Sequence, residues 1–197
     1  MSFHLGLTGS IGMGKSTTAQ MFVAEGCALW DADQAVHRLY GPQGVAVAPI
    51  GDLFSDAIGP EGVDRTVLRS IIQTDPTALP QIEAIVHPLV QADRAAFKAQ
   101  ADADVLVFDI PLLFETGGEQ EMDAVACVFT SEEEQQRRVL ARGTMTQAQF
   151  EQIRAKQMPI DEKKARSDFL IETDTVEHAK EQVAAILRQI RAGQKHA

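Results

Sequence analysis

Residues 9–16 place the strongest constraint on the fold, because their sequence, GSIGMGKS, fits the pattern G-x-x-x-x-G-K-[ST]. Glycines let the backbone curl so that successive N–H groups face one point, and a following helix directs its positive end there. Phe3–Thr8 predicts a buried strand before the loop, and Thr17–Glu25 predicts a helix after it, ended by Gly26. Strand, glycine loop and helix together predict a phosphate-binding loop.

The same pattern assigns roles within the loop. Lys15 is expected to reach the β- and γ-phosphates of a nucleotide, and the Ser16 hydroxyl is expected to bind Mg²⁺. The nucleotide-binding residues are predicted to be Gly9, Ile11, Gly12, Met13, Gly14, Lys15, Ser16 and Thr17.

Length and composition predict one α/β domain, with room for insertions. The chain has 197 residues, of which 45% are hydrophobic and 23% charged, and its net charge is −10. An acidic chain is a poor candidate for binding nucleic acid, so we expect no nucleic-acid partner. Cys27 and Cys127 lie in apolar runs, as buried thiols of a reducing compartment do. Neither a signal-like segment nor a membrane-spanning run is visible, so we expect a cytoplasmic protein without a membrane partner.

Four further apolar runs predict strands, which with the first would form a five-stranded parallel sheet. They are Cys27–Trp30, Val105–Phe108, Ala124–Phe129 and Phe169–Ile171. Helical segments separate them, and a capping pair, Ser131 with Glu134 or Thr146 with Gln149, opens two of these helices. Thr175 is expected to cap the last one.

Carboxylates follow two of the predicted strands. Ligands of parallel α/β sheets bind beyond the carboxyl ends of the strands, where the glycine loop also begins. Asp31 and Asp33 follow the second strand, and Asp109 ends the Val105–Phe108 strand at a Walker-B position. Asp33 is predicted to be a general base or a magnesium-shell ligand, whereas Asp31 is equally well explained as a helix cap.

The segment 64–100 is helical and longer than a crossover between parallel strands requires. Asp64 is predicted to cap its first helix, and His87-Pro88 to break the second part once. An extra helical layer here would receive a phosphoryl acceptor, with Arg65, Arg69 and His87 as candidate contacts. Solvated or capping side chains explain these three residues equally well.

Residues 137–166 hold eight of the eighteen Lys and Arg residues of this acidic chain. A helical hairpin that carries arginines closes over nucleotide phosphates in small kinases. The alternative is a solvated pair of charged helices.

Among nucleotide-binding classes, a small-molecule kinase fits best. The chain contains no asparagine, so it lacks the Asn-Lys-x-Asp guanine reader of a GTPase switch. A motor or transport ATPase would usually be larger and would need oligomeric partners. The residues alone leave the acceptor open.

The sequence also resembles the dephospho-coenzyme A kinase family along nearly its whole length. The resembling stretches are Gly6–Thr17, Asp31-Ala32-Asp33 with Arg38, Asp64-Arg65 with Leu68-Arg69, Ile82–Pro88, Pro111–Glu115, Arg137–Arg142, Gln157 and Ser167–Ile171. Four departures stand out: Ser10 and Met13 in the loop, Ser167 before the last strand, and Glu172-Thr173-Asp174 in place of an Asn-containing turn. The last of these puts a nucleobase contact from that turn in doubt.

The resemblance implies an ATP- and Mg²⁺-dependent kinase that phosphorylates the ribose 3′-hydroxyl of dephospho-coenzyme A. Asp33, Lys15 and Arg142 would be catalytic, with Arg142 closing from a lid. The implied acceptor-binding residues are Thr8, Asp33, Arg65, His87, Pro111, Leu112, Leu113 and Glu115.

It also implies a three-layer P-loop kinase fold in three parts. The core would be 1–63, 101–115, 124–130 and 161–197, the acceptor region 64–100, and the lid 116–160, overlapping the core strand 124–130. The alternatives are a P-loop kinase for a nucleoside, nucleotide or sugar acid, and a P-loop ATPase regulatory module.

Overall fold

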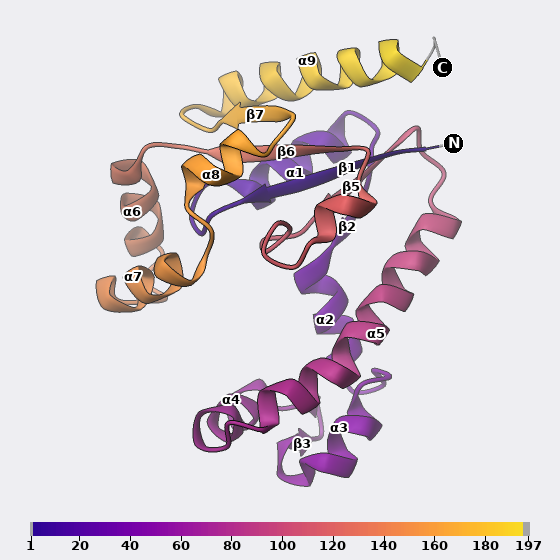
Figure 1. Ribbon diagram of the computed structural model, residues 1–197, viewed down its shortest axis with the longest axis vertical. Helices are drawn as coiled ribbons and strands as arrows, with labels where there is room; N and C mark the ends of the chain where they lie inside the picture. Colours follow the sequence, from indigo (N-terminus) through magenta and orange to yellow (C-terminus); the bar gives the residue numbers. More distant parts are fainter. Residues whose placement is uncertain (1, 195–197) are drawn as a thin grey trace. The chain divides into compact units, whose positions relative to one another are not determined.

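A computed structural model of the chain describes residues 2–194 (Figure 1). The chain forms two compact units. The first unit combines the residues up to Trp30 with those from Ala101 onward, and the second comprises Asp31–Gln100. The chain therefore leaves the first unit after its second strand and returns seventy residues later.

A five-stranded sheet forms the centre of the first unit, as the sequence predicts. Its strands are β1 (Phe3–Gly9), β2 (Ala28–Asp31), β5 (Val105–Asp109), β6 (Ala124–Phe129) and β7 (Phe169–Glu172), in the spatial order β2-β5-β1-β6-β7. Strand β1 is parallel to both its neighbours, with Leu5 opposite Val107 on β5 and Ala124 on β6. The predicted parallel α/β sheet is confirmed.

Both faces of the sheet are covered, which explains why its strands read as continuous apolar runs. Leu5 and Leu7 lie on the face that packs with Phe22 of α1 (Lys15–Ala24) and Leu187 of α9 (Val176–Gln194). Helices α1 and α9 contact each other, and α9 lies along the sheet (Figure 1). Val125, whose side chain alternates to the opposite face, packs with Leu113 and Phe114 from the segment after β5. That segment continues into a short 3₁₀ helix, Gly118–Glu121.

Between β6 and β7 lie α6 (Glu132–Ala141), α7 (Gln147–Lys156) and α8 (Ile160–Ala165). The capping box at α7 is confirmed: Thr146 and Gln149 each bind the other's backbone N–H. The box predicted at α6 is only half right. Ser131 accepts from the Glu134 N–H, but the Glu134 carboxylate binds Arg137 and Arg138 instead of closing the box. Thr175 caps α9 as predicted, by accepting from the His178 N–H.

The second unit has a core of its own. It comprises α2 (Ala32–Tyr40), α3 (Val47–Leu53), a 3₁₀ turn (Ser55–Ala57), the hairpin β3 (Ile58–Gly59) and β4 (Gly62–Val63), α4 (Arg65–Thr74) and α5 (Ala78–Gln100). Leu39, Ile50, Leu68 and Ile82 meet in its centre. Asp64 caps α4 as predicted, accepting from the N–H groups of Thr66 and Val67.

The expected break at His87-Pro88 is wrong, because α5 runs without interruption over 23 residues. Pro88 lacks an N–H and so removes one helical hydrogen bond, that to Ala84. Ile82 and Val86, which are both buried, continue the apolar face up to the proline. Packing on the core of the unit thus offsets the local cost of the proline.

Candidate active site

The glycine loop joins the end of β1 to the start of α1, where the motif predicts it. Gly12 and Gly14 have φ angles of 78° and 89°, which favour glycine over other residues. Space is also short at both positions. A Cβ on Gly12 would meet Val139 and Gln135 of α6, and one on Gly14 would lie 3.2 Å from the Thr173 hydroxyl. The loop therefore fits closely against α6 and the turn after β7.

Met13 and Lys15 anchor the loop from inside. The Met13 side chain is only 1% exposed and belongs to the main core, so this departure from the family pattern fixes the loop instead of loosening it. The Lys15 ammonium forms an ion pair with the Asp109 carboxylate, which is itself buried at the end of β5. The predicted Walker-B acid and the loop lysine thus lie together.

Three side chains from outside the loop bind its peptide groups. Gln135 Nε2 donates to the Ile11 carbonyl at 2.8 Å, and the Ile11 N–H donates to Gln157 Oε1 at 3.1 Å. Thr173 Oγ1 lies 2.9 Å from the Met13 carbonyl. In the sequence, Gln157 stands out only as a position that resembles the family, and Thr173 only as part of a turn that departs from it. Gln135 was not predicted, because nothing in a polar helix indicates which glutamine is buried.

A cavity of about 510 Å³ opens beside the loop within the first unit. Gly14 and Thr17 line it from the loop side, Arg138 and Arg142 from α6, and Asp174 from the turn after β7. Arginines and the N-terminus of α1 make this a favourable place for an anionic ligand.

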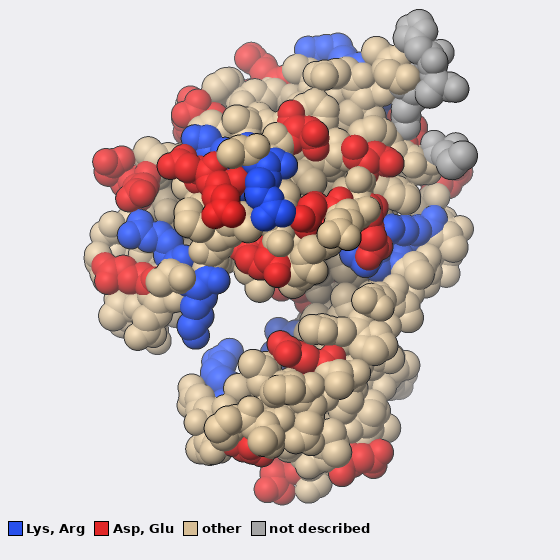
Figure 2. All heavy atoms as spheres, in the orientation of Figure 1, with Lys and Arg blue, Asp and Glu red and all other residues tan. Residues whose placement is uncertain are grey.

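Most cations of the 137–166 region are neutralised by carboxylates. Six of the eight have a partner: Arg137 and Arg138 with Glu134, Arg154 with Glu132, Lys163 with Glu115, Lys164 with Asp161, and Arg166 with Glu119. Within the described residues, Arg142 and Lys156 have none. On the face drawn in Figure 2, basic side chains likewise lie among acidic ones. Arg142 is thus the arginine of the cavity whose charge is available to a ligand.

The segment after β5 is held by a buried lysine that the sequence did not single out. Lys163 is 0% exposed; its Nζ donates to the Pro111 carbonyl at 3.0 Å and lies 2.9 Å from Glu115 Oε1. The Thr8 hydroxyl also donates to the Pro111 carbonyl, and Glu115 accepts from the Met158 N–H.

Thr8, Pro111 and Glu115, which were predicted to bind an acceptor, therefore form hydrogen bonds or ion pairs within the protein itself. Burial raises the pKa of Glu115, but its bonds to Lys163 and the Met158 N–H outweigh burial and leave that pKa lower than usual. Leu113 is fully buried, whereas Leu112 is 42% exposed. Among the apolar residues that the resemblance implies for the acceptor, Leu112 is exposed, Pro111 is half-buried and Leu113 is buried.

The remaining predicted residues lie in the second unit. Asp31 caps α2 by accepting from the Gln34 N–H at 2.9 Å, as one of its two predicted roles requires. Asp33 follows in the first turn of α2, exposed and without a hydrogen bond in that unit. Arg65, at the start of α4, lies over the Tyr40 ring at 5.4 Å. Arg69 and His87 are exposed on α4 and α5.

Both cysteines are buried and free, as predicted. Burial raises the pKa of each thiol to about 11, so neither is suited to act as a thiolate nucleophile.

The parallel sheet, the loop between β1 and α1 and the arginine-lined cavity beside it define a P-loop kinase, a class that uses ATP. A family model described as Dephospho-CoA kinase matches residues 3–178. The chain belongs to the dephospho-CoA kinase family.

Two relatives with that name match over 96% or more of the chain. A dephospho-CoA kinase of Ruegeria pomeroyi is 70% identical over 197 residues, which is all of both chains. One of Cereibacter sphaeroides is 56% identical over 96% of both chains. The crystal structure of a Thermus thermophilus protein has a TM-score of 0.85 at 30% identity, covering 95% of this chain and 97% of its own.

Proposed function

We propose that the chain transfers the γ-phosphate of ATP to the ribose 3′-hydroxyl of dephospho-coenzyme A, the last step of coenzyme A synthesis. Family membership supports the reaction. The observation that carries the chemistry is the phosphate loop, whose glycines, buried Met13 and Lys15–Asp109 ion pair build a nucleotide site into the core.

On the nucleotide side, we assign the β- and γ-phosphates to Lys15 and to the N–H groups of Gly9–Thr17. A bound phosphate would compete with Asp109 for the Lys15 ammonium. Arg142 would then neutralise charge on the transferring phosphoryl group, a role in which one arginine is worth about 10³-fold or more in rate.

We assign Mg²⁺ to the Ser16 hydroxyl, with Asp109 nearby as a further oxygen donor. The Ser16 side chain is exposed and makes no hydrogen bond within the described residues of its unit, and hydroxyl and carboxylate oxygens suit this ion. When bound, Mg²⁺ offsets phosphate charge.

On the acceptor side, Asp33 would accept the proton of the attacking hydroxyl. Its carboxylate has no structural bond in its own unit, whereas the Asp31 carboxylate is used as a cap. Arg65 would bind an acceptor phosphate, and Thr8, His87 and the segment Pro111, Leu112, Leu113 and Glu115 would frame the acceptor, Leu112 by direct contact. Residues 64–100 would form the acceptor region and 116–160 the lid.

We place the enzyme in the cytoplasm. Two free, buried cysteines suit a reducing compartment. No helix among residues 2–194 combines the length and apolarity needed to cross a bilayer.

A coupled assay with a panel of acceptors tests the reaction. ATP and Mg²⁺ are supplied with dephospho-coenzyme A, nucleosides, nucleotides or sugar acids, and the phosphorylated product is located by NMR. We expect turnover with dephospho-coenzyme A alone and phosphate on the 3′-hydroxyl. We expect none with Lys15→Met, whose circular-dichroism spectrum is compared with that of wild type because the substitution also removes the ion pair with Asp109. Turnover only with another acceptor would favour a different small-molecule kinase, and ATP hydrolysis with no acceptor would favour a regulatory module.

A further inference from the structure

Two carbonyl groups on the back of the phosphate loop are each bound by a buried side chain from elsewhere in the first unit. Gln135 binds the Ile11 carbonyl at 2.8 Å and is 1% exposed; Thr173 binds the Met13 carbonyl at 2.9 Å and is 7% exposed. Gly12 and Gly14 are the residues that directly follow these two carbonyls.

The geometry of the peptide group gives these bonds a consequence. A trans peptide is planar, so its C=O and N–H point in opposite directions. Fixing the Ile11 carbonyl toward Gln135 turns the Gly12 N–H away from α6, and fixing the Met13 carbonyl toward Thr173 turns the Gly14 N–H away from that residue. Neither glycine has a side chain to hold its own peptide, and both adopt a positive φ.

We propose that Gln135 and Thr173 are positioning residues that aim the Gly12 and Gly14 N–H groups at the nucleotide phosphates. The proposal rests on the assignment of this loop to ATP. Neither residue contacts the reacting atoms in this scheme; each acts through one peptide group of the loop.

The bonds around Thr173 leave its hydroxyl hydrogen for the loop. Arg138 Nη1 donates to Thr173 Oγ1 at 3.0 Å, which uses the hydroxyl as an acceptor. The nearest carbonyls to the hydroxyl are Met13 at 2.9 Å and Phe129 at 3.2 Å, and the Phe129 carbonyl already accepts from the Thr173 N–H. We therefore assign the single hydroxyl hydrogen of Thr173 to the hydrogen bond with the Met13 carbonyl.

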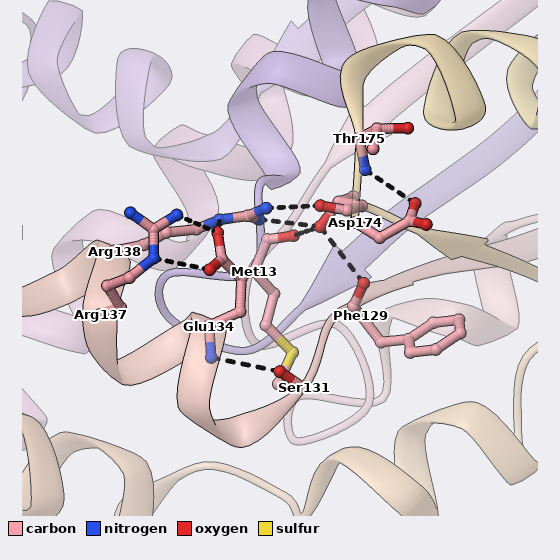
Figure 3. A network of polar contacts seen from close by, with 9 residues as sticks. Met13, Phe129, Ser131, Glu134, Arg137, Arg138, Asp174 and Thr175 are labelled. Atoms are coloured by element: carbon pink, nitrogen blue, oxygen red, sulfur yellow. Dashed lines mark hydrogen bonds and ion pairs between the residues drawn. The ribbon is translucent and has the colours of Figure 1, made fainter.

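Arg138 in turn fixes Thr173. Its Nη2 donates to the Thr173 carbonyl at 2.5 Å, and its Nε donates to Glu134 at 2.6 Å (Figure 3). Gln135 and Arg138 are three residues apart and so lie on one face of α6. One helix thereby holds both carbonyls, one directly and one through Thr173.

The test uses Thr173→Val, which keeps the shape of the side chain but removes the hydroxyl, and Thr173→Ser, which keeps the hydroxyl. Ser167→Ala is the matched control, because Ser167 Oγ also donates to a backbone carbonyl, that of Lys163, at 2.8 Å but away from the loop. The Kd of Mg-ADP is measured by calorimetry without acceptor, alongside the KM of ATP, the KM of dephospho-coenzyme A and the thermal midpoint.

We expect Thr173→Val to raise the Kd of Mg-ADP and the KM of ATP by roughly 5- to 20-fold, the effect of one lost hydrogen bond. The KM of dephospho-coenzyme A should stay within about twofold. Thr173→Ser should restore nucleotide affinity, and Ser167→Ala should leave it unchanged. Gln135→Met should behave as Thr173→Val does.

Wild-type ADP affinity in a folded Thr173→Val would overturn the proposal, as would a serine variant that binds no better than valine. Because ADP binding requires no acceptor, a wrong assignment of the acceptor would not affect these results. A wild-type protein that bound no Mg-ADP would instead refute the proposed function.

Discussion

The residues assigned to nucleotide and those assigned to acceptor differ in how the protein holds them. In the first unit, Lys15 is paired with Asp109, Met13 is buried in the core, and the loop carbonyls are bound by buried side chains. In the second unit, Asp33 and His87 are exposed and make no hydrogen bond within that unit. The phosphate site is thus built into the fold, whereas Asp33 and His87, the acceptor residues of the second unit compared here, are left for a ligand to engage.

This contrast has an energetic meaning. A group that is bonded in the folded protein contributes to stability, so its removal affects both stability and activity. An exposed group without partners contributes little to stability, and its removal tests function alone. Substitutions in the two units should therefore separate along these lines.

The largest effect is expected for Asp33→Asn. The amide cannot accept the proton of the attacking hydroxyl, so kcat should fall by roughly 10²- to 10⁴-fold. The KM of ATP and the thermal midpoint should barely change, because Asp33 has no bond to lose in its unit. Steady-state kinetics and calorimetry measure both. Asp31→Asn is the matched control, since asparagine caps a helix as well as aspartate does. An unchanged kcat in Asp33→Asn would exclude this residue as the base.

Lys163→Met should produce the largest loss of stability. It removes a fully buried ammonium and leaves the Glu115 side chain, which is 20% exposed, without its charged partner. Breaking such a pair costs about 3 kcal/mol, which urea denaturation would measure as a lower midpoint at constant slope. Adding Glu115→Gln should recover part of the loss. A loss below about 1 kcal/mol would mean that the pair behaves as a surface ion pair.

Signals that lie close together in the sequence predicted the fold well. The strand Ala124–Phe129 agrees with β6 to the residue, and the Thr146–Gln149 capping box is present as expected. Both depend on neighbouring residues alone. The helix break predicted at Pro88 is absent because packing of Ile82 and Val86, which the local sequence does not show, offsets the local cost of the proline.

Of the candidate site, the sequence predicted the residues of the loop motif but not the side chains that support the loop. The loop motif identifies Lys15 and Ser16, but Gln135, Lys163 and the task of Thr173 depend on contacts more than forty residues apart. The charge-rich segment also misled in part, because most of its cations turned out to have carboxylate partners. A charge pattern alone cannot distinguish Arg142, which has no carboxylate partner among residues 2–194, from Arg138, which fixes Thr173.

Arg65→Met tests acceptor binding, and we expect it to have a moderate effect on the KM of dephospho-coenzyme A. Loss of a phosphate contact should raise the KM of dephospho-coenzyme A by about tenfold and leave the KM of ATP unchanged. The Arg65 guanidinium over the Tyr40 ring contributes little at an exposed site, so the thermal midpoint should hold. Arg69→Met, on the same helix, is the comparison. A larger acceptor effect at Arg69 would transfer the phosphate contact to that residue.

The smallest effect concerns the carboxylate that pairs with the α6 arginines. Hydrogen bonds from Arg137, then from Arg138, lower the pKa of Glu134 from an ordinary 4.5 to about 2. A lowered folded pKa stabilises the protein above the unfolded pKa, and this contribution is lost as the pH falls from 4.5 toward 2.

Wild type should therefore exceed Glu134→Gln in thermal midpoint at pH 7, by no more than about 2–4 °C because the group is exposed and screened. The difference in thermal midpoint should become smaller below pH 4.5. It should also become smaller in 1 M salt, where the Debye length is about 3 Å. The same variant removes the carboxylate that orients Arg138, which binds Thr173. Its effect on the Kd of Mg-ADP therefore measures how much Glu134 and Arg138 contribute to the position of Thr173. A midpoint difference that kept its full size at pH 2.5 would assign the stabilisation to the shape of Glu134 and not to its charge.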